Sequence, residues 1–95
     1  MPEQSEAERR EVHYSGRVQG VGFRYTVRSL AGRYDVSGFV KNLRDGRVQL
    51  VAEGPPGEVA GLLEAVRGAM GRYIHDEHEE TGPATGEFGG FDIRF

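Results

Sequence analysis

Apolar and polar residues alternate with a period of two in several stretches of the chain, the pattern of half-buried β-strands. The clearest case is residues 11–18, where Val12, Tyr14 and Val18 share one phase and His13 lies on the other. Other stretches with strand patterns span residues 36–43, 47–53 and 91–95.

Between these strands, two segments repeat apolar residues at helical spacing, which predicts helices with one face toward a core. The first covers residues 23–34, with its apolar stripe at Phe23, Val27, Leu30, Ala31 and Tyr34. The second follows the interruption at residues 55–57 and ends before Gly71, with its stripe at Val59, Leu62, Leu63, Val66 and Met70.

Two connecting regions affect how the strands pair. Asp45-Gly46 is a strong hairpin signal, either as a two-residue turn or as part of a longer loop with a bulge. Residues 72–81 are mostly polar, which favours an exposed or edge strand. His75 and His78 within it are three apart and would point to opposite faces of a strand, which disfavours a shared metal ion.

The order strand, helix, strand, strand, helix, strand, strand predicts an α+β fold. It is the order of a ferredoxin-like split βαβ sandwich, with an antiparallel sheet of four to five strands covered on one face by two helices. Residues 1–10 lack hydrophobic periodicity and are predicted to be a disordered N-terminal tail. Residues 11–95 then form a single domain.

Size and composition restrict the class of protein. A chain of 95 residues allows one small core, and the absence of cysteine excludes disulfides and thiolate metal sites. No apolar run approaches the ~20 residues of a membrane span. The polar first ten residues lack the apolar region of a secretory signal. We therefore expect a cytoplasmic protein that does not bind membranes and, at this size, a monomer.

Charge is unevenly distributed along this mildly acidic chain, whose net charge is −3. Residues 16–48 contain seven basic and two acidic residues and so carry +5, whereas the rest carries −8. A positive centre of this kind suits a small anionic ligand. A nucleic-acid-binding domain would usually be basic throughout, so no nucleic-acid partner is expected.

The junction at residues 16–24, between the first strand and the first helix, combines glycines with an arginine. A helix start leaves backbone N–H groups unpaired, and the helix dipole favours an anion there. Gly20 and Gly22 allow the positive φ angles that turn successive N–H groups inward, and Arg24 can add a guanidinium fork. The alternative is a loop that only turns the chain. We call the possible anion-binding loop from Gln19 to Arg24 the cradle. Arg28 either flanks this cradle or is a solvated helix residue.

Asn42 is the second candidate residue. Asparagine has poor strand propensity, so a role outside sheet packing would explain its position in a predicted strand. Its amide could hold a water molecule. The alternative is that it begins the turn before Asp45-Gly46.

Two segments of this chain resemble the signature segments of the acylphosphatases. The first is GxVQGVGFR at residues 16–24, and the second is GFVKNLxDGxV at residues 38–48. The pair Glu53-Gly54 and the motifs near the end of the chain are similar as well, so the resemblance covers residues 11–95. Residues 72–82 match less well, because the family usually has a more apolar fourth strand.

The resemblance implies a hydrolase that splits the carboxyl-phosphate anhydride of an acyl phosphate into carboxylate and inorganic phosphate, without metal or organic cofactor. It implies that Arg24 grips the phosphoryl oxygens and that Asn42 holds the attacking water. The three histidines lie outside both segments and no carboxylate lies between Gln19 and Arg24. Our hypothesis is therefore that the substrate's own phosphate takes the proton of the water. The implied phosphate-binding loop consists of Gln19, Gly20, Val21, Gly22, Phe23 and Arg24.

Two other classes of protein compete with this hypothesis. One is a non-catalytic anion-binding or accessory domain, of the kind found in carbamoyl-transfer maturation proteins. The other is an RNA-binding domain of similar topology, which would need exposed aromatic residues on a basic sheet face. Phe39 alone is thin support for it.

Overall fold

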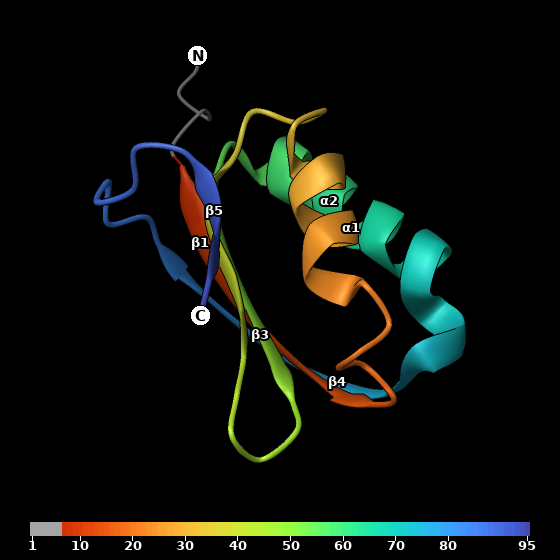
Figure 1. Ribbon diagram of the computed structural model, residues 1–95. Coiled ribbons are helices and arrows are strands. Elements are labelled where there is room, and N and C mark those ends of the chain that lie inside the picture. Colours follow the sequence, from red (N-terminus) through yellow and green to blue (C-terminus); the bar gives the residue numbers. More distant parts are fainter. Residues whose placement is uncertain (1–6) are drawn as a thin grey trace.

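The computed structural model describes residues 7–95. The chain forms two α-helices, a short 3₁₀-helix and five strands, and Figure 1 shows how the α-helices and strands are arranged. In chain order the elements are β1 (Glu8–Gly16), α1 (Phe23–Ala31), β2 (Ser37–Asn42), β3 (Val48–Gly54), α2 (Pro56–Met70), η2 (Gly71–Tyr73), β4 (Ile74–Pro83) and β5 (Phe91–Arg94).

The five strands form one sheet in the order β4-β1-β3-β2-β5. Both α-helices lie on the same side of this sheet (Figure 1), which confirms the predicted α+β, ferredoxin-like sandwich. One detail of the prediction is corrected. β5 pairs with β2 in parallel, so the sheet is mixed and not wholly antiparallel. The two strands are joined through β3, α2 and β4, and this long connection permits a parallel pairing.

The main core lies between the sheet and the helices. Val12, Leu50 and Val40 are neighbours across β1, β3 and β2 in the observed register, and all three are buried. Val27 of α1 and Leu62 of α2 belong to the same buried cluster. The strand and helix periodicities seen in the sequence therefore meet in one apolar layer, which fixes both helices on the sheet.

The predicted N-terminal tail, residues 1–10, is corrected at its end, because β1 already begins at Glu8. The first residues of this strand are polar on both faces, so they carry no alternating pattern. They are held by the ladders to β3 and β4 and by ion pairs, such as that between Arg10 and Glu79 at 3.1 Å. Residues 1–6 of the predicted tail lie outside the described residues.

The polar segment after α2 is an edge strand, as the sequence favoured. β4 pairs with β1 alone, and most of its side chains are exposed.

The β2–β3 hairpin shows which of the two turn types the Asp45-Gly46 segment forms. The N–H of Leu43 donates to the carbonyl of Arg47 at 2.8 Å, and the N–H of Gly46 donates back to Leu43 at 3.2 Å. With Gly46 at φ 96°, this is the longer loop with a bulge.

The opposite face of the sheet carries a buried carboxylate. Glu53 is 3% exposed, and its oxygens accept hydrogen bonds from the Thr85 N–H and hydroxyl, both at 2.9 Å, and from the Gly86 N–H at 3.0 Å. Arg9 Nη1 lies 3.3 Å away. Burial by itself would raise the pKa of Glu53, but these hydrogen bonds outweigh it and lower that pKa. The carboxylate thus anchors the segment before β5 to the sheet.

Glu53→Gln should lower the free energy of unfolding at pH 7 by about 1–3 kcal/mol, because an amide cannot accept all of these hydrogen bonds. The pKa of Glu53 is lowered in the folded state, so its contribution is present above the unfolded value of about 4.3 and is lost as the pH falls below it. Urea unfolding at pH 7 and pH 3 should show a smaller difference between variant and wild type at pH 3. The exposed Glu80→Gln is the control, and an equal loss at both pH values would contradict this account.

Candidate active site

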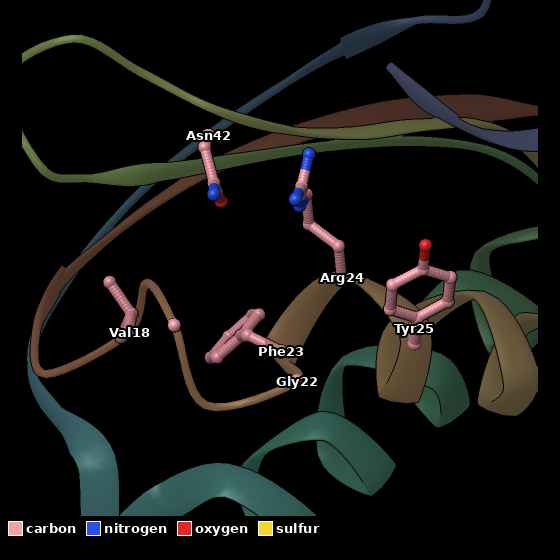
Figure 2. A pocket seen from close by; sticks show the side chains of 7 residues that line it. Val18, Gly22, Phe23, Arg24, Tyr25 and Asn42 are labelled. Atoms are coloured by element: carbon pink, nitrogen blue, oxygen red, sulfur yellow. The ribbon is translucent and has the colours of Figure 1, made fainter. Parts of the chain in front are cut away.

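A cavity of about 220 Å³ opens between the start of α1 and the end of β2. Two segments far apart in the sequence, the β1–α1 junction and the end of β2, meet at it (Figure 2). Its walls are formed by Val18, Gly20, Gly22, Phe23, Arg24, Tyr25 and Asn42.

The floor of the cavity is the N-terminus of α1. The first helical hydrogen bond runs from the Thr26 N–H to the Gly22 carbonyl at 3.0 Å, so the N–H groups before Thr26 have no partner within the helix. No side-chain cap binds this helix end in the described part of the chain. Gly20 and Gly22 have φ angles of 80° and 79°, which only glycine adopts without strain. This is the geometry of a backbone anion site.

Arg24 and Asn42 come from opposite walls and point into the same space (Figure 2). Arg24 is half-buried in the first turn of α1, and Asn42 is the last residue of β2. The Asn42 Oδ1 is buried and has no hydrogen-bond partner among residues 7–95. An orphaned acceptor of this kind needs a partner such as a water molecule.

The geometry also bears on whether Asn42 serves the turn that follows it. The hydrogen bonds of that turn run between Leu43, Gly46 and Arg47, and Asp45 accepts from the Arg47 N–H at 3.1 Å. The side-chain Oδ1 of Asn42 takes part in none of them. The described contacts therefore favour a role in the cavity over one in the turn.

Gln19 connects the two segments that form the cavity. Its side-chain Nε2 donates to the carbonyl of Leu43 at 2.8 Å and to that of Arg47 at 3.0 Å. Leu43, which directly follows Asn42, and Arg47 are the two residues whose hydrogen bond closes the β2–β3 loop. The side chain of Gln19 thus fastens the cradle to the hairpin.

The remaining predicted residues divide between the cavity and the core. Phe23 is buried and its ring centroid lies 5.2 Å from that of Tyr14, while Val21 packs on the core and does not line the cavity. Arg28 is exposed and does not line the cavity either. Val18 and Tyr25 are cavity residues that the sequence prediction missed.

The polar groups of the cavity are a cation, an amide and backbone N–H donors. No carboxylate and no imidazole lines it in the described part of the chain. Within residues 7–95, no three His, Cys, Asp or Glu side chains gather as a metal site would require. In the same range, none of the helices is both long and apolar enough to cross a bilayer.

The fold and the cavity define an α+β sandwich with an uncapped helix N-terminus and an arginine at one cavity. Comparison with known proteins gives this class a family. The sequence model described as Acylphosphatase matches residues 10–93. The chain belongs to the acylphosphatase family.

Individual relatives agree with this assignment. An acylphosphatase of Bacillus velezensis is 58% identical over 76 residues, which cover 74% of this chain and 84% of the relative. An acylphosphatase of Rubrobacter xylanophilus is 42% identical over 90 residues, covering 94% and 82%. The crystal structure of the Bacillus subtilis acylphosphatase superimposes with a TM-score of 0.83 at 32% identity, covering 93% of this chain and 99% of that one.

Gln19→Met keeps the length of the side chain but removes the donor shared by the two carbonyls. We expect it to weaken the binding of inorganic phosphate two- to tenfold, because the loop is then no longer tied to the hairpin. Gln49→Met is the matched control, since the Nε2 of Gln49 donates to Glu11 away from the cavity. Titration of each variant with phosphate, followed by NMR, measures the difference. Equal affinity in both variants would remove Gln19 from the site.

Proposed function

We propose that this chain hydrolyses acyl phosphates by attack of water at phosphorus, releasing a carboxylate and inorganic phosphate. The observation that carries the proposal is the unpaired, buried Oδ1 of Asn42, which shares a cavity with Arg24 and the open N-terminus of α1. A single small space thus offers donors for a phosphoryl group and an acceptor for a water molecule. Family membership supports the same reaction.

The phosphoryl group is bound by the loop from Gln19 to Arg24. The unpaired N–H groups at the start of α1 donate to its oxygens, and the guanidinium of Arg24 adds charge-assisted hydrogen bonds. As the bond to the acyl oxygen breaks, charge on the phosphoryl oxygens is stabilised by donors that are already in place.

Asn42 positions the water that attacks. Its Oδ1 accepts a hydrogen bond from the water, which directs a lone pair of the water oxygen at phosphorus. The new O–P bond forms, the P–O bond to the acyl group breaks, and the electron pair leaves with the carboxylate. The amide of Asn42 cannot take the proton, so a phosphoryl oxygen of the substrate accepts it.

The carboxylate of an acyl phosphate is a good leaving group, so positioning and charge stabilisation suffice for the reaction. We therefore propose that catalysis needs neither a metal ion nor an organic cofactor. All the groups named above come from one chain, which supports a monomer as the active form. A cytoplasmic location stays a prediction from the sequence.

A non-catalytic accessory domain is the less favoured alternative. The relatives named above match most of this chain and carry the name acylphosphatase. An RNA-binding role also lacks support, because Phe39 is buried on its strand and is covered by Phe88 at a ring-centroid distance of 5.8 Å. Hydrolysis is the function that the cavity supports best.

Two substitutions separate binding from catalysis. Arg24→Ala should lower kcat/KM for benzoyl phosphate by at least about 100-fold and weaken inhibition by inorganic phosphate, since a charge-assisted donor is lost. Asn42→Ala should lower kcat by about 100-fold and leave phosphate inhibition within twofold of wild type, since only the water is misplaced. The assays are run in EDTA. Arg28→Ala, one turn along the exposed face of α1, is the control.

If Asn42→Ala unfolds the protein while activity per folded molecule is unchanged, the residue serves the fold and not the reaction. If the folded wild type does not hydrolyse benzoyl phosphate, the enzyme proposal fails and a binding domain takes its place.

The proton transfer makes a separate prediction about pH. Because a phosphoryl oxygen takes the proton, the pH–rate profile of kcat/KM should follow the ionisation of the substrate. Acyl phosphates of different phosphate pKa should shift the profile accordingly. A profile that stays the same for all substrates would point to an ionisable enzyme side chain.

A further inference from the structure

Two aromatic side chains stand out on the surface. Tyr25 is 59% exposed and Phe95 is 86% exposed, and within residues 7–95 they are the exposed large apolar side chains. Single exposed aromatics are common in folded proteins and need no explanation. Here, however, both adjoin the same residue, Arg24.

Tyr25 follows Arg24 in the first turn of α1 and forms part of the cavity wall. Phe95 directly follows β5, and its ring centroid lies 4.7 Å from the Arg24 Cζ, a cation–π distance. The arginine that faces the phosphoryl site thus has an aromatic neighbour on its own helix and another from the end of the sheet.

The in-line geometry of phosphoryl transfer indicates where the acyl group lies relative to these rings. In phosphoryl transfer the attacking and leaving oxygens lie roughly in line through phosphorus. Figure 2 shows Asn42 on one side of Arg24 and Tyr25 on the other. With the water held at Asn42 and the phosphoryl group at Arg24, the acyl group leaves the cavity on the side of Tyr25.

We propose that Tyr25 and Phe95 form a subsite for the acyl group and favour acyl phosphates with an aromatic or otherwise bulky apolar acyl chain. This proposal rests on the proposed hydrolysis and adds the substrate class to it. The rings contribute apolar surface that a bound acyl chain covers, and an aromatic chain can also stack on them. An acetyl group is too small to cover either ring.

The alternative role of Phe95 is to support the guanidinium of Arg24 through the cation–π contact. That role would change the rate for every acyl phosphate equally, because all share the phosphoryl end. A subsite changes the rate for large acyl groups more than for small ones. The ratio of kcat/KM for benzoyl phosphate to that for acetyl phosphate therefore separates the two roles.

The experiment compares wild type with Tyr25→Ala, Phe95→Ala and the ring-retaining Tyr25→Phe. We expect the benzoyl-to-acetyl ratio to fall about three- to tenfold in each alanine variant and to stay within twofold in Tyr25→Phe. Inhibition by inorganic phosphate should be unchanged in the Tyr25 variants, because phosphate occupies only the cradle. Both side chains are exposed, and alanine is a good helix former at position 25 in α1, so these variants should keep their fold.

A ratio that stays at the wild-type value in both alanine variants would overturn the subsite, even where both rates fall together. A wild type that hydrolyses acetyl phosphate and benzoyl phosphate with equal kcat/KM would overturn it too, while leaving the proposed hydrolysis in place. No hydrolysis of either substrate by the folded wild type would instead overturn the proposed function, and the subsite with it.

Discussion

The burial of one face of the sheet under two helices is the constraint on which the rest of the structure depends. Val27 packs α1 onto the layer that contains Val12, Leu50 and Val40, and none of these side chains is exposed beyond 1%. Since α1 cannot shift on this layer without opening cavities, the position of its first turn is fixed. Phe23, buried at the very start of the helix, transmits this constraint to the cradle.

The cavity lies where this apolar layer ends, and it contains polar groups that the fold itself does not satisfy. A buried acceptor without a partner, such as the Oδ1 of Asn42, costs about 1–3 kcal/mol. This is a large part of the small free energy of unfolding of a domain of this size. The unpaired oxygen of Asn42 and the uncapped N–H groups of α1 face one cavity. Their common location is explained if ligand and water complete the hydrogen bonding there.

Local patterns predicted much of this arrangement from the sequence. The stripe from Phe23 to Tyr34 predicted α1, although the helix itself ends at Ala31, and the glycines at positions 20 and 22 have the expected positive φ angles. Asn42, to which the resemblance assigns the attacking water, lines the cavity. Features set by distant contacts were missed. The start of β1 at Glu8 depends on pairing with β3 and β4, and the parallel pairing of β5 depends on the path of the whole chain. The periodicity of apolar residues along the chain carries no information about the start of β1 or about the direction in which β5 pairs.

In the proposed reaction, the two ends of the substrate are recognised by different means. The phosphoryl end binds to backbone groups whose positions are set by the core and by the hydrogen bonds from Gln19 to the hairpin, so little binding energy is needed to order them. Such a site is indifferent to the acyl chain. Any preference among acyl phosphates must therefore arise outside the cradle, at exposed side chains such as Tyr25. Because these do not belong to the core, they can vary without disturbing the fold.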